Sequence, residues 1–160
     1  MSVNGTVEAA RHGIARSPHW PTVEHHHKIM EPLCRCCHKG EPSVGIQVHH
    51  IFPFHYCIAL GRPDLELDQR NLVSLCEHEV GRPCDNHHLL IGHLRDFKSS
   101  NIHVLTDCTS YDSRSEASII IDSLYLMKEA ARLVPLDEMT SADKQAFITL
   151  MNTTYPLVIK

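Results

Sequence analysis

Cysteines and histidines spaced as metal ligands are the feature that most limits how this chain can fold. Cys34 and Cys37 are separated by two residues, and Cys76 lies much further along the sequence. Two thiolates on one turn with a distant third ligand are typical of a tetrahedral structural zinc site, which holds together the segments that carry its ligands. Cys84 would complete an all-cysteine site, whereas His87 would complete a site of three cysteines and one histidine, and we place His87 first. The alternative is that these cysteines are small buried hydrophobic residues.

The composition bears on the cellular compartment and on the kind of partner. The 160 residues include seven cysteines and fourteen histidines, and the sequence shows neither a signal peptide nor a long apolar run. An odd number of cysteines in such a chain favours metal ligands and buried thiols over disulfides, so we expect a cytoplasmic protein with no membrane contact. The net charge of −4 argues against nucleic acid as a partner. Residues 1–40, however, carry five basic and three acidic side chains, so the sequence is compatible with a basic face in its amino-terminal part.

The pattern of apolar and turn residues predicts a small α+β fold. Residues 1–16 lack periodicity and are expected to form a loose arm. Residues 17–101 should form the domain that carries the metal ligands, and residues 102–160 a helical extension packed on it. Asp85 or Asn86 is expected to be the N-cap of the helix that follows the second strand. The expected helices are 20–30, 87–97, 115–134 and 141–151, and the expected strands are 44–54 and 71–77, joined by a loop over 55–70.

The dipeptide His49-His50 follows an apolar run that is expected to be a strand. Adjacent residues of a strand point to opposite faces, so His49 can face a metal ion while His50 faces a different target. A neutral imidazole can accept a proton from an attacking water, which gives the pair two chemical roles. A histidine pair on a strand is more often a surface feature, and only Asn71 and His88, further along the chain, favour the chemical interpretation.

The segment from Trp20 to Asn101 resembles the HNH endonucleases of the ββα-metal, or His-Me finger, superfamily. The resemblance implies a core of two strands and one helix, supported by a zinc knuckle, that hydrolyses DNA phosphodiester bonds with one divalent metal ion. It also implies products with 5′-phosphate and 3′-hydroxyl ends, and a bacterial or phage-infected cell as the setting. The motifs that carry it are Cys34-x-x-Cys37, Gln-Val-His-His-Ile-Phe-Pro-Phe-His at 47–55, Leu-Glu-Leu-Asp-Gln-Arg-Asn-Leu-Val-Ser-Leu-Cys at 65–76, Asn-His-His-Leu-Leu-Ile-Gly-His at 86–93 and Phe-Lys-Ser-Ser-Asn at 97–101.

The resemblance also implies roles for single residues. It makes His49 the first metal ligand, His50 the general base and His88 a second metal ligand. It makes Asn71 the residue that fixes the loop next to the base. Related nucleases place a further histidine about one turn beyond the first helical one, so His93 is a candidate third ligand. The alternative for His93 is a histidine that merely ends a helix.

Two features of the chain depart from this pattern. The family has Asn-Cys-His where this chain has Asn86-His87-His88, which puts the structural zinc site in doubt unless His87 or Cys84 replaces the missing cysteine. The second departure is that five residues separate His88 from His93, a rotation of about 140° on a regular α-helix. The two side chains can therefore converge only if the helix loosens at Gly92.

The choice of metal and the contacts with DNA follow from residue types. Imidazole ligands suit manganese, nickel and zinc, whereas magnesium prefers oxygen ligands. We therefore expect manganese or nickel to support activity at least as well as magnesium. Arg95 and Lys98 lie where a contact with phosphate would be useful, and the alternative is that they serve solubility alone.

A rival interpretation belongs to a different functional class. The chain could be a zinc-stabilised nucleic-acid-binding or adaptor domain that keeps the form of a nuclease but does not cut. The small share of basic side chains in the sequence favours that interpretation slightly. The apolar segment 115–134 could pack on the core, or it could pair with a second copy and form a homodimer.

Overall fold

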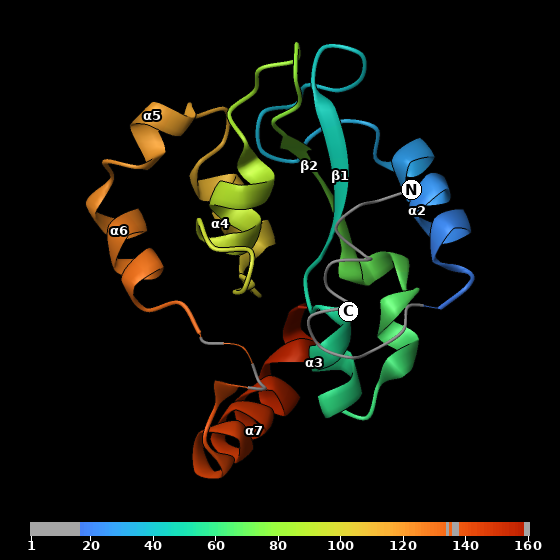
Figure 1. Ribbon diagram of the computed structural model, residues 1–160, viewed down its shortest axis with the longest axis vertical. Coiled ribbons are helices and arrows are strands. Elements are labelled where there is room, and N and C mark those ends of the chain that lie inside the picture. The colour runs from blue at the N-terminus through green and yellow to red at the C-terminus, as the bar shows by residue number, and fades with distance from the viewer. Residues whose placement is uncertain (1–16, 134, 136–137, 159–160) are drawn as a thin grey trace.

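The computed structural model describes residues 17–133, 135 and 138–158 of the 160-residue chain. The predicted arm, residues 1–16, lies outside the described residues. Within them the chain has the predicted small α+β fold, in which helices surround one antiparallel sheet of two strands (Figure 1). No helix among the described residues is long and apolar enough to cross a membrane.

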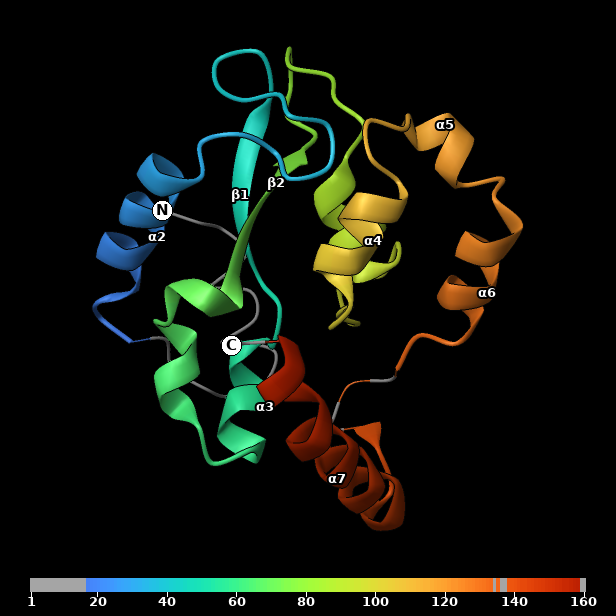
Figure 2. The ribbon, with the colours of Figure 1, turned by 180° about the vertical axis from the view of Figure 1, so that it is seen from behind.

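The sheet is formed by β1 (Gly45–His50) and β2 (Leu72–Glu77), whose register places His50 opposite Leu72. Nearly every residue of the pair is buried, because helices cover both of its faces. α2 (Trp20–Met30) lies on one side, as both opposite views show, and α4 (Val104–Ser110) lies on the other (Figures 1 and 2). The predicted helix 20–30 and the second predicted strand are thereby confirmed.

The connection between the strands is mostly helical, so the predicted strand 44–54 is too long and the predicted loop 55–70 is wrong. Pro53 has extended backbone angles at the N-cap position of α3 (Phe54–Ala59), and a residue with such angles commonly precedes a helix. Four of the six side chains of α3 are buried. Two 3₁₀ turns follow, at Pro63–Glu66 and Gln69–Asn71.

The chain after β2 forms a short π-helix, His88–Gly92, and not the predicted helix 87–97. Leu94 and Arg95 have φ angles of 50° and 67°, a left-handed conformation that ends the helix at once. The predicted caps are also wrong, because the N-cap position falls on His87, whose side chain makes no cap hydrogen bond.

The described part of the last sixty residues contains the α-helices α4, α5 (Glu116–Ile119), α6 (Ser123–Ala130) and α7 (Ser141–Val158). The single predicted helix 115–134 is broken because the Asp122 side chain accepts hydrogen bonds from Leu124 N and Tyr125 N and so starts a new helix. The predicted helix 141–151 is confirmed and extends further. Eight buried side chains of this part join the same hydrophobic cluster as the hairpin: Ile102, Val104, Cys108, Tyr111, Ile119, Tyr125, Phe147 and Met151.

Glu31 fastens the end of α2 to the open edge of β2. Its carboxylate accepts hydrogen bonds from Ser74 N at 2.9 Å, His27 Nε2 at 3.0 Å and Arg35 Nε at 2.5 Å. Desolvation by burial raises the pKa of Glu31, but the donors outweigh it and the net shift is downward from the ordinary value of 4.5. The ionised carboxylate therefore stabilises the contact between this helix and the sheet.

Glu31→Gln is expected to lower the free energy of unfolding at neutral pH by about 1–3 kcal/mol, because buried donors lose a charged acceptor. The folded pKa lies below the unfolded one, so this stabilisation is present above pH 4.5 and is lost as the pH falls through the folded pKa. Urea unfolding at neutral pH and well below pH 4.5 measures the difference, with Glu24→Gln on the same helix as control. A deficit of the same size at both pH values would contradict the prediction.

Candidate metal centres

The side chains of Cys34, Cys37, Cys76 and His87 converge at one point and could hold a metal ion such as zinc. His87 Nδ1 lies 3.7 Å from Cys34 Sγ and 3.5 Å from Cys76 Sγ, and the Sγ atoms of Cys37 and Cys76 are 3.9 Å apart. A tetrahedral zinc ion with ordinary bond lengths separates sulfur from nitrogen by about 3.6 Å and sulfur from sulfur by about 3.8 Å. The donors therefore already stand at the spacing that a four-ligand zinc site requires.

His87 is oriented as a ligand by the carboxyl-terminal part of the chain. Its Nε2–H donates to the carbonyl oxygen of Arg114 at 3.0 Å, so Nδ1 carries the lone pair and faces the thiols. Desolvation by burial lowers the pKa of His87, but the thiols of Cys34, Cys36 and Cys37 raise it to about 12. In the neutral ring Nδ1 is the nitrogen that would bind a metal ion, and an ion between thiolates would take the place of the proton that these thiols favour.

The other cysteines lie outside this group of four. The group of four contains His87 and leaves out Cys84, which is half-buried. The Sγ atom of Cys84 accepts a hydrogen bond from Asn86 N at 3.2 Å. Cys36 donates to Tyr111 O, and Cys57 donates to Phe52 O. Cys57 and Cys108 are buried and belong to the hydrophobic core.

A second group brings together His49 from β1 and His88 and His93 from the two ends of the π-helix. One ring nitrogen of each lies within 4.8 Å of the other two. His49 is only 3% exposed, its Nε2 has no hydrogen-bond partner among the described residues, and desolvation by burial lowers its pKa well below 6.5. A buried neutral imidazole with an unpartnered nitrogen is chemically suited to bind a metal ion.

The tautomers of His88 and His93 favour the same conclusion. His88 Nδ1 donates to Glu77 Oε1 at 2.9 Å, and His93 Nδ1 donates to the carbonyl oxygen of Ser99 at 2.6 Å. In the neutral rings both Nε2 atoms then carry lone pairs, and they face each other at 3.2 Å. Two ligand nitrogens of a tetrahedral ion stand about 3.3 Å apart, so a cation between them would relieve the repulsion of the lone pairs.

The π-helix is what allows His88 and His93 to meet. Its wider turn brings residues five apart onto one side, which is the loosening at Gly92 that the sequence requires. Asn101 N donates to Gly92 O, and Arg95 N donates to Leu89 O, each at 2.9 Å, so tertiary contacts hold this turn.

Gly92→Ala is expected to weaken metal binding by the three imidazoles about tenfold, within the range seen when a ligand loses its support. A Cβ atom at this position would stand 3.0 Å from His49 Nδ1 and 3.1 Å from His49 Cε1, so the ring must move by a few tenths of an ångström. Isothermal titration with manganese measures the affinity, and the zinc content serves as the control because Gly92 does not touch that site. An unchanged manganese affinity would contradict this geometry.

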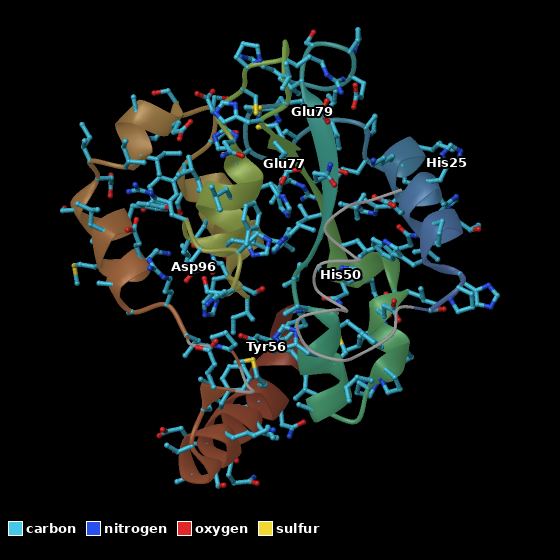
Figure 3. The ribbon with its side chains drawn as sticks, in the orientation of Figure 1. His25, His50, Tyr56, Glu77, Glu79 and Asp96 are labelled. Carbon is cyan, nitrogen blue, oxygen red and sulfur yellow. The ribbon has the colours of Figure 1, made fainter. Side chains whose placement is uncertain are left out.

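His50 points to the other face of the hairpin, toward α2 and the connection helices, as predicted for adjacent strand residues (Figure 3). Its ring packs on Trp20 with centroids 4.5 Å apart, and its Nε2–H donates to Glu66 O at 2.9 Å. A carbonyl oxygen only accepts, so Nδ1 carries the lone pair of the neutral ring. In the neutral ring, Nδ1 is therefore the basic nitrogen of His50.

Asn71 fixes the chain next to His50. Its Oδ1 accepts from Phe52 N at 2.8 Å, and its Nδ2 donates to Phe52 O and Leu65 O, each at 2.9 Å. The side chain is fully buried, and the start of the connection is tied through it to Leu65, next to the residue whose carbonyl receives His50. This position agrees with the predicted structural role of Asn71.

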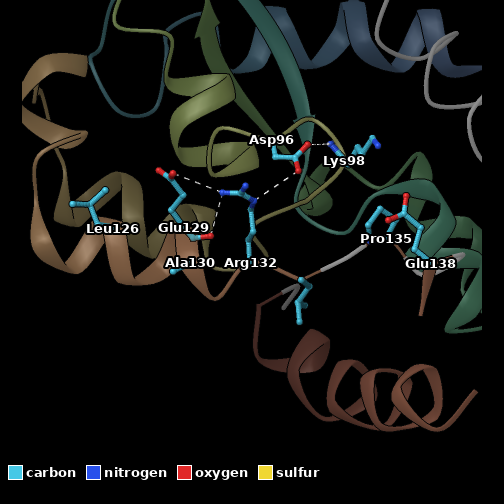
Figure 4. Close-up of a pocket in the computed structure, with 9 residues that line it drawn as sticks. Asp96, Lys98, Leu126, Glu129, Ala130, Arg132, Pro135 and Glu138 are labelled. Atoms are coloured by element: carbon cyan, nitrogen blue, oxygen red, sulfur yellow. Dashed lines mark hydrogen bonds and ion pairs between the residues drawn. The ribbon is translucent and has the colours of Figure 1, made fainter. Parts of the chain in front are cut away.

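Arg95 and Lys98 are exposed but are engaged with the carboxyl-terminal helices. Arg95 Nη1 lies 3.5 Å from Glu129 Oε2 on α6, and Lys98 lines a cavity of about 580 Å³ between the 96–98 turn and α6. Arg132 crosses this cavity with Nε 3.7 Å from Asp96 Oδ2 (Figure 4). The predicted contacts with nucleic acid stay a prediction, because carboxylates surround these cations.

The sequence interpretation missed three residues of these sites. Glu77 and Ser99 orient two ligands, and Trp20 covers His50. Glu77 could have been found, because it follows the zinc ligand Cys76 on a strand and therefore points to the opposite face. Neither Trp20 nor the carbonyl of Ser99 has a comparable signal in the sequence.

The chain matches no family model, no curated protein and no solved structure.

Proposed function

We propose that the chain is a metal-dependent endonuclease of the HNH type that hydrolyses phosphodiester bonds of DNA. The observation that carries the proposal is the arrangement at the end of β1, where His49 joins two imidazoles on one face and the ring of His50 is fixed by Glu66 O on the other. Asn71, buried behind the connection, holds the second arrangement in place. The resemblance to the HNH endonucleases supplies the reaction that such an arrangement serves.

The residues fit the steps of phosphodiester hydrolysis. A divalent ion held by His49, His88 and His93 would stabilise charge on the phosphate and on the leaving 3′-oxygen. His50 Nδ1 takes a proton from water while the water oxygen bonds to phosphorus and the bond to the 3′-oxygen breaks. The 3′-oxygen gains a proton from solvent, so the products carry 5′-phosphate and 3′-hydroxyl ends. Glu66 O keeps His50 in the required tautomer throughout.

The ligand set also bears on which metal serves. Three imidazole nitrogens suit manganese, nickel, cobalt or zinc, whereas magnesium prefers oxygen ligands. We expect manganese and nickel to support cleavage at least as well as magnesium.

Conversion of supercoiled plasmid tests the proposal. Purified protein with its zinc site filled is incubated with manganese, nickel, magnesium or chelator, and end labelling identifies the 5′ and 3′ groups. Nicked or linear products that need the added metal and carry 5′-phosphates are the expected result. No conversion with any metal, from folded protein that binds manganese, would contradict nuclease activity on duplex DNA.

A second candidate is a nucleic-acid-binding or adaptor module that does not cut, and one observation favours it. His50 is only 6% exposed and lies against Trp20, which leaves little of the ring accessible to a phosphate. Retention of DNA at low salt without cleavage would favour this candidate, because phosphate contacts strengthen as salt is diluted. No retention at any salt concentration would contradict both functions.

A further inference from the structure

The two metal centres are built on two shared dipeptides. Cys76 and Glu77 end β2, and His87 and His88 begin the segment that faces it. The first residue of each dipeptide belongs to the zinc group, and the second belongs to the three-imidazole site or supports it. One side chain of each pair therefore turns to each centre.

Two contacts join these dipeptides side by side. Cys76 Sγ lies 3.5 Å from His87 Nδ1 and accepts a hydrogen bond from His87 N at 3.5 Å, while Glu77 Oε1 accepts from His88 Nδ1 at 2.9 Å. Glu77 lies toward the end of the hairpin away from His50 (Figure 3). The chain between the dipeptides has one isolated bridge, Glu79 with Arg82, and His78 N donates to Asn86 Oδ1. The two cross-links join the segments beside this loop.

We propose that the zinc site controls the metal affinity of the three-imidazole site through the Glu77–His88 contact. Zinc bound by Cys76 and His87 clamps the two segments, and the clamp presents the Glu77 carboxylate to His88 Nδ1. That hydrogen bond fixes His88 with Nε2 toward His49 and His93, and it makes the ring a stronger donor. Glu77 is thus a positioning residue, and zinc acts on the catalytic metal without touching it. The inference rests on the proposed function in that it takes the three imidazoles as a metal site.

Metal affinity, and not cleavage, is the readout. Manganese binding is titrated in wild type and in variants that break either cross-link. Cys37→Ser removes a zinc ligand outside both dipeptides, and Glu77→Ala removes the carboxylate. Each change is expected to weaken manganese binding about 10–100-fold, with Glu77→Gln intermediate because it keeps a neutral acceptor. Cys84→Ser, a thiol beside the zinc group but outside it, is the matched control and should change neither zinc content nor manganese affinity.

A double variant distinguishes coupling between the zinc site and Glu77 from two independent losses of manganese affinity. If zinc acts through Glu77, the variant with both Cys37→Ser and Glu77→Ala binds manganese about as weakly as the weaker single variant. A double variant in which the two fold-losses of manganese affinity multiply would overturn the proposal. Wild type that binds one ion per chain would contradict the three-imidazole site and with it the proposed function, whereas two ions with independent affinities would overturn the coupling alone.

A reciprocal measurement keeps the test decisive if Cys37→Ser does not fold. Coupling of two sites is symmetric, so manganese must tighten zinc by the same factor by which zinc tightens manganese. Competition for zinc with a chromogenic chelator is run with and without saturating manganese. Wild type should hold zinc at least tenfold more tightly with manganese, and His49→Ala, which lies outside both dipeptides, should lose that gain. Equal zinc affinities in wild type would overturn the proposal.

Discussion

Replacing His50 with alanine is expected to lower the single-turnover rate of DNA cleavage by about 10²–10⁴-fold, the usual contribution of a general base. The imidazole lies on the opposite face of β1 from the three-imidazole group, so manganese affinity and zinc content should stay as in wild type. The rate is measured with end-labelled duplex under excess enzyme. Loss of rate with intact metal binding would separate the proton acceptor from the metal ligands.

The exposed histidine His25 on α2 offers a matched control for this substitution. His25→Ala removes an imidazole from the same helix that covers His50 but from its outer side, and it should leave the rate unchanged. Full activity in His50→Ala would show that another group accepts the proton. A melting temperature far below wild type would instead attribute the loss to the missing contact with Trp20.

Replacing Cys34 with serine is expected to abolish zinc binding and to lower the melting temperature strongly. Cys34 is fully buried, and its Sγ stands among the other donors of the group. Structural zinc contributes about 10–16 kcal/mol of apparent binding free energy in small zinc domains. A typical domain has a free energy of unfolding of only about 5–15 kcal/mol, so the loss of zinc binding energy is comparable with the whole stability of a domain. Metal analysis and circular dichroism on heating measure both effects.

Cys84→Ser is the control for the zinc prediction as well, because Cys84 is half-buried and stands outside the group of four. It should bind one zinc per chain and melt as wild type does. A Cys34→Ser protein that melts at the wild-type temperature without zinc would contradict a structural role for the metal. Loss of zinc from Cys84→Ser would reassign the fourth ligand.

Side-chain chemistry at fixed spacing was the part of the molecule that sequence could predict. Residue type and spacing identify Cys34, Cys37 and Cys76 as candidate zinc ligands. The alternation of side chains along a strand predicts that His49 and His50 point to opposite faces. The α+β class and the first helix follow from periodicity in the same way. The choice between His87 and Cys84 was open in the sequence, and the structure groups the His87 ring, and not Cys84, with the three thiols.

Local pattern could not predict the elements that depend on distant contacts. The π-helix closes because Asn101 returns to Gly92, and the chain then turns at two left-handed residues that are not glycine. The helix over 115–134 breaks because the side chain of Asp122 competes as a cap, a choice that apolar periodicity does not register. The contact of Trp20 with His50 joins α2 to β1, and no spacing rule connects those residues.

A divalent ion between three imidazoles is the centre of the proposed chemistry, and anomalous diffraction from crystals grown with manganese would locate it. The predicted result is one manganese peak about 2.0–2.2 Å from the Nε2 atoms of His49, His88 and His93, separate from a zinc peak among Cys34, Cys37, Cys76 and His87. Manganese absent from the three imidazoles, in crystals whose zinc site is filled, would contradict the assignment of the metal site on which the nuclease proposal stands.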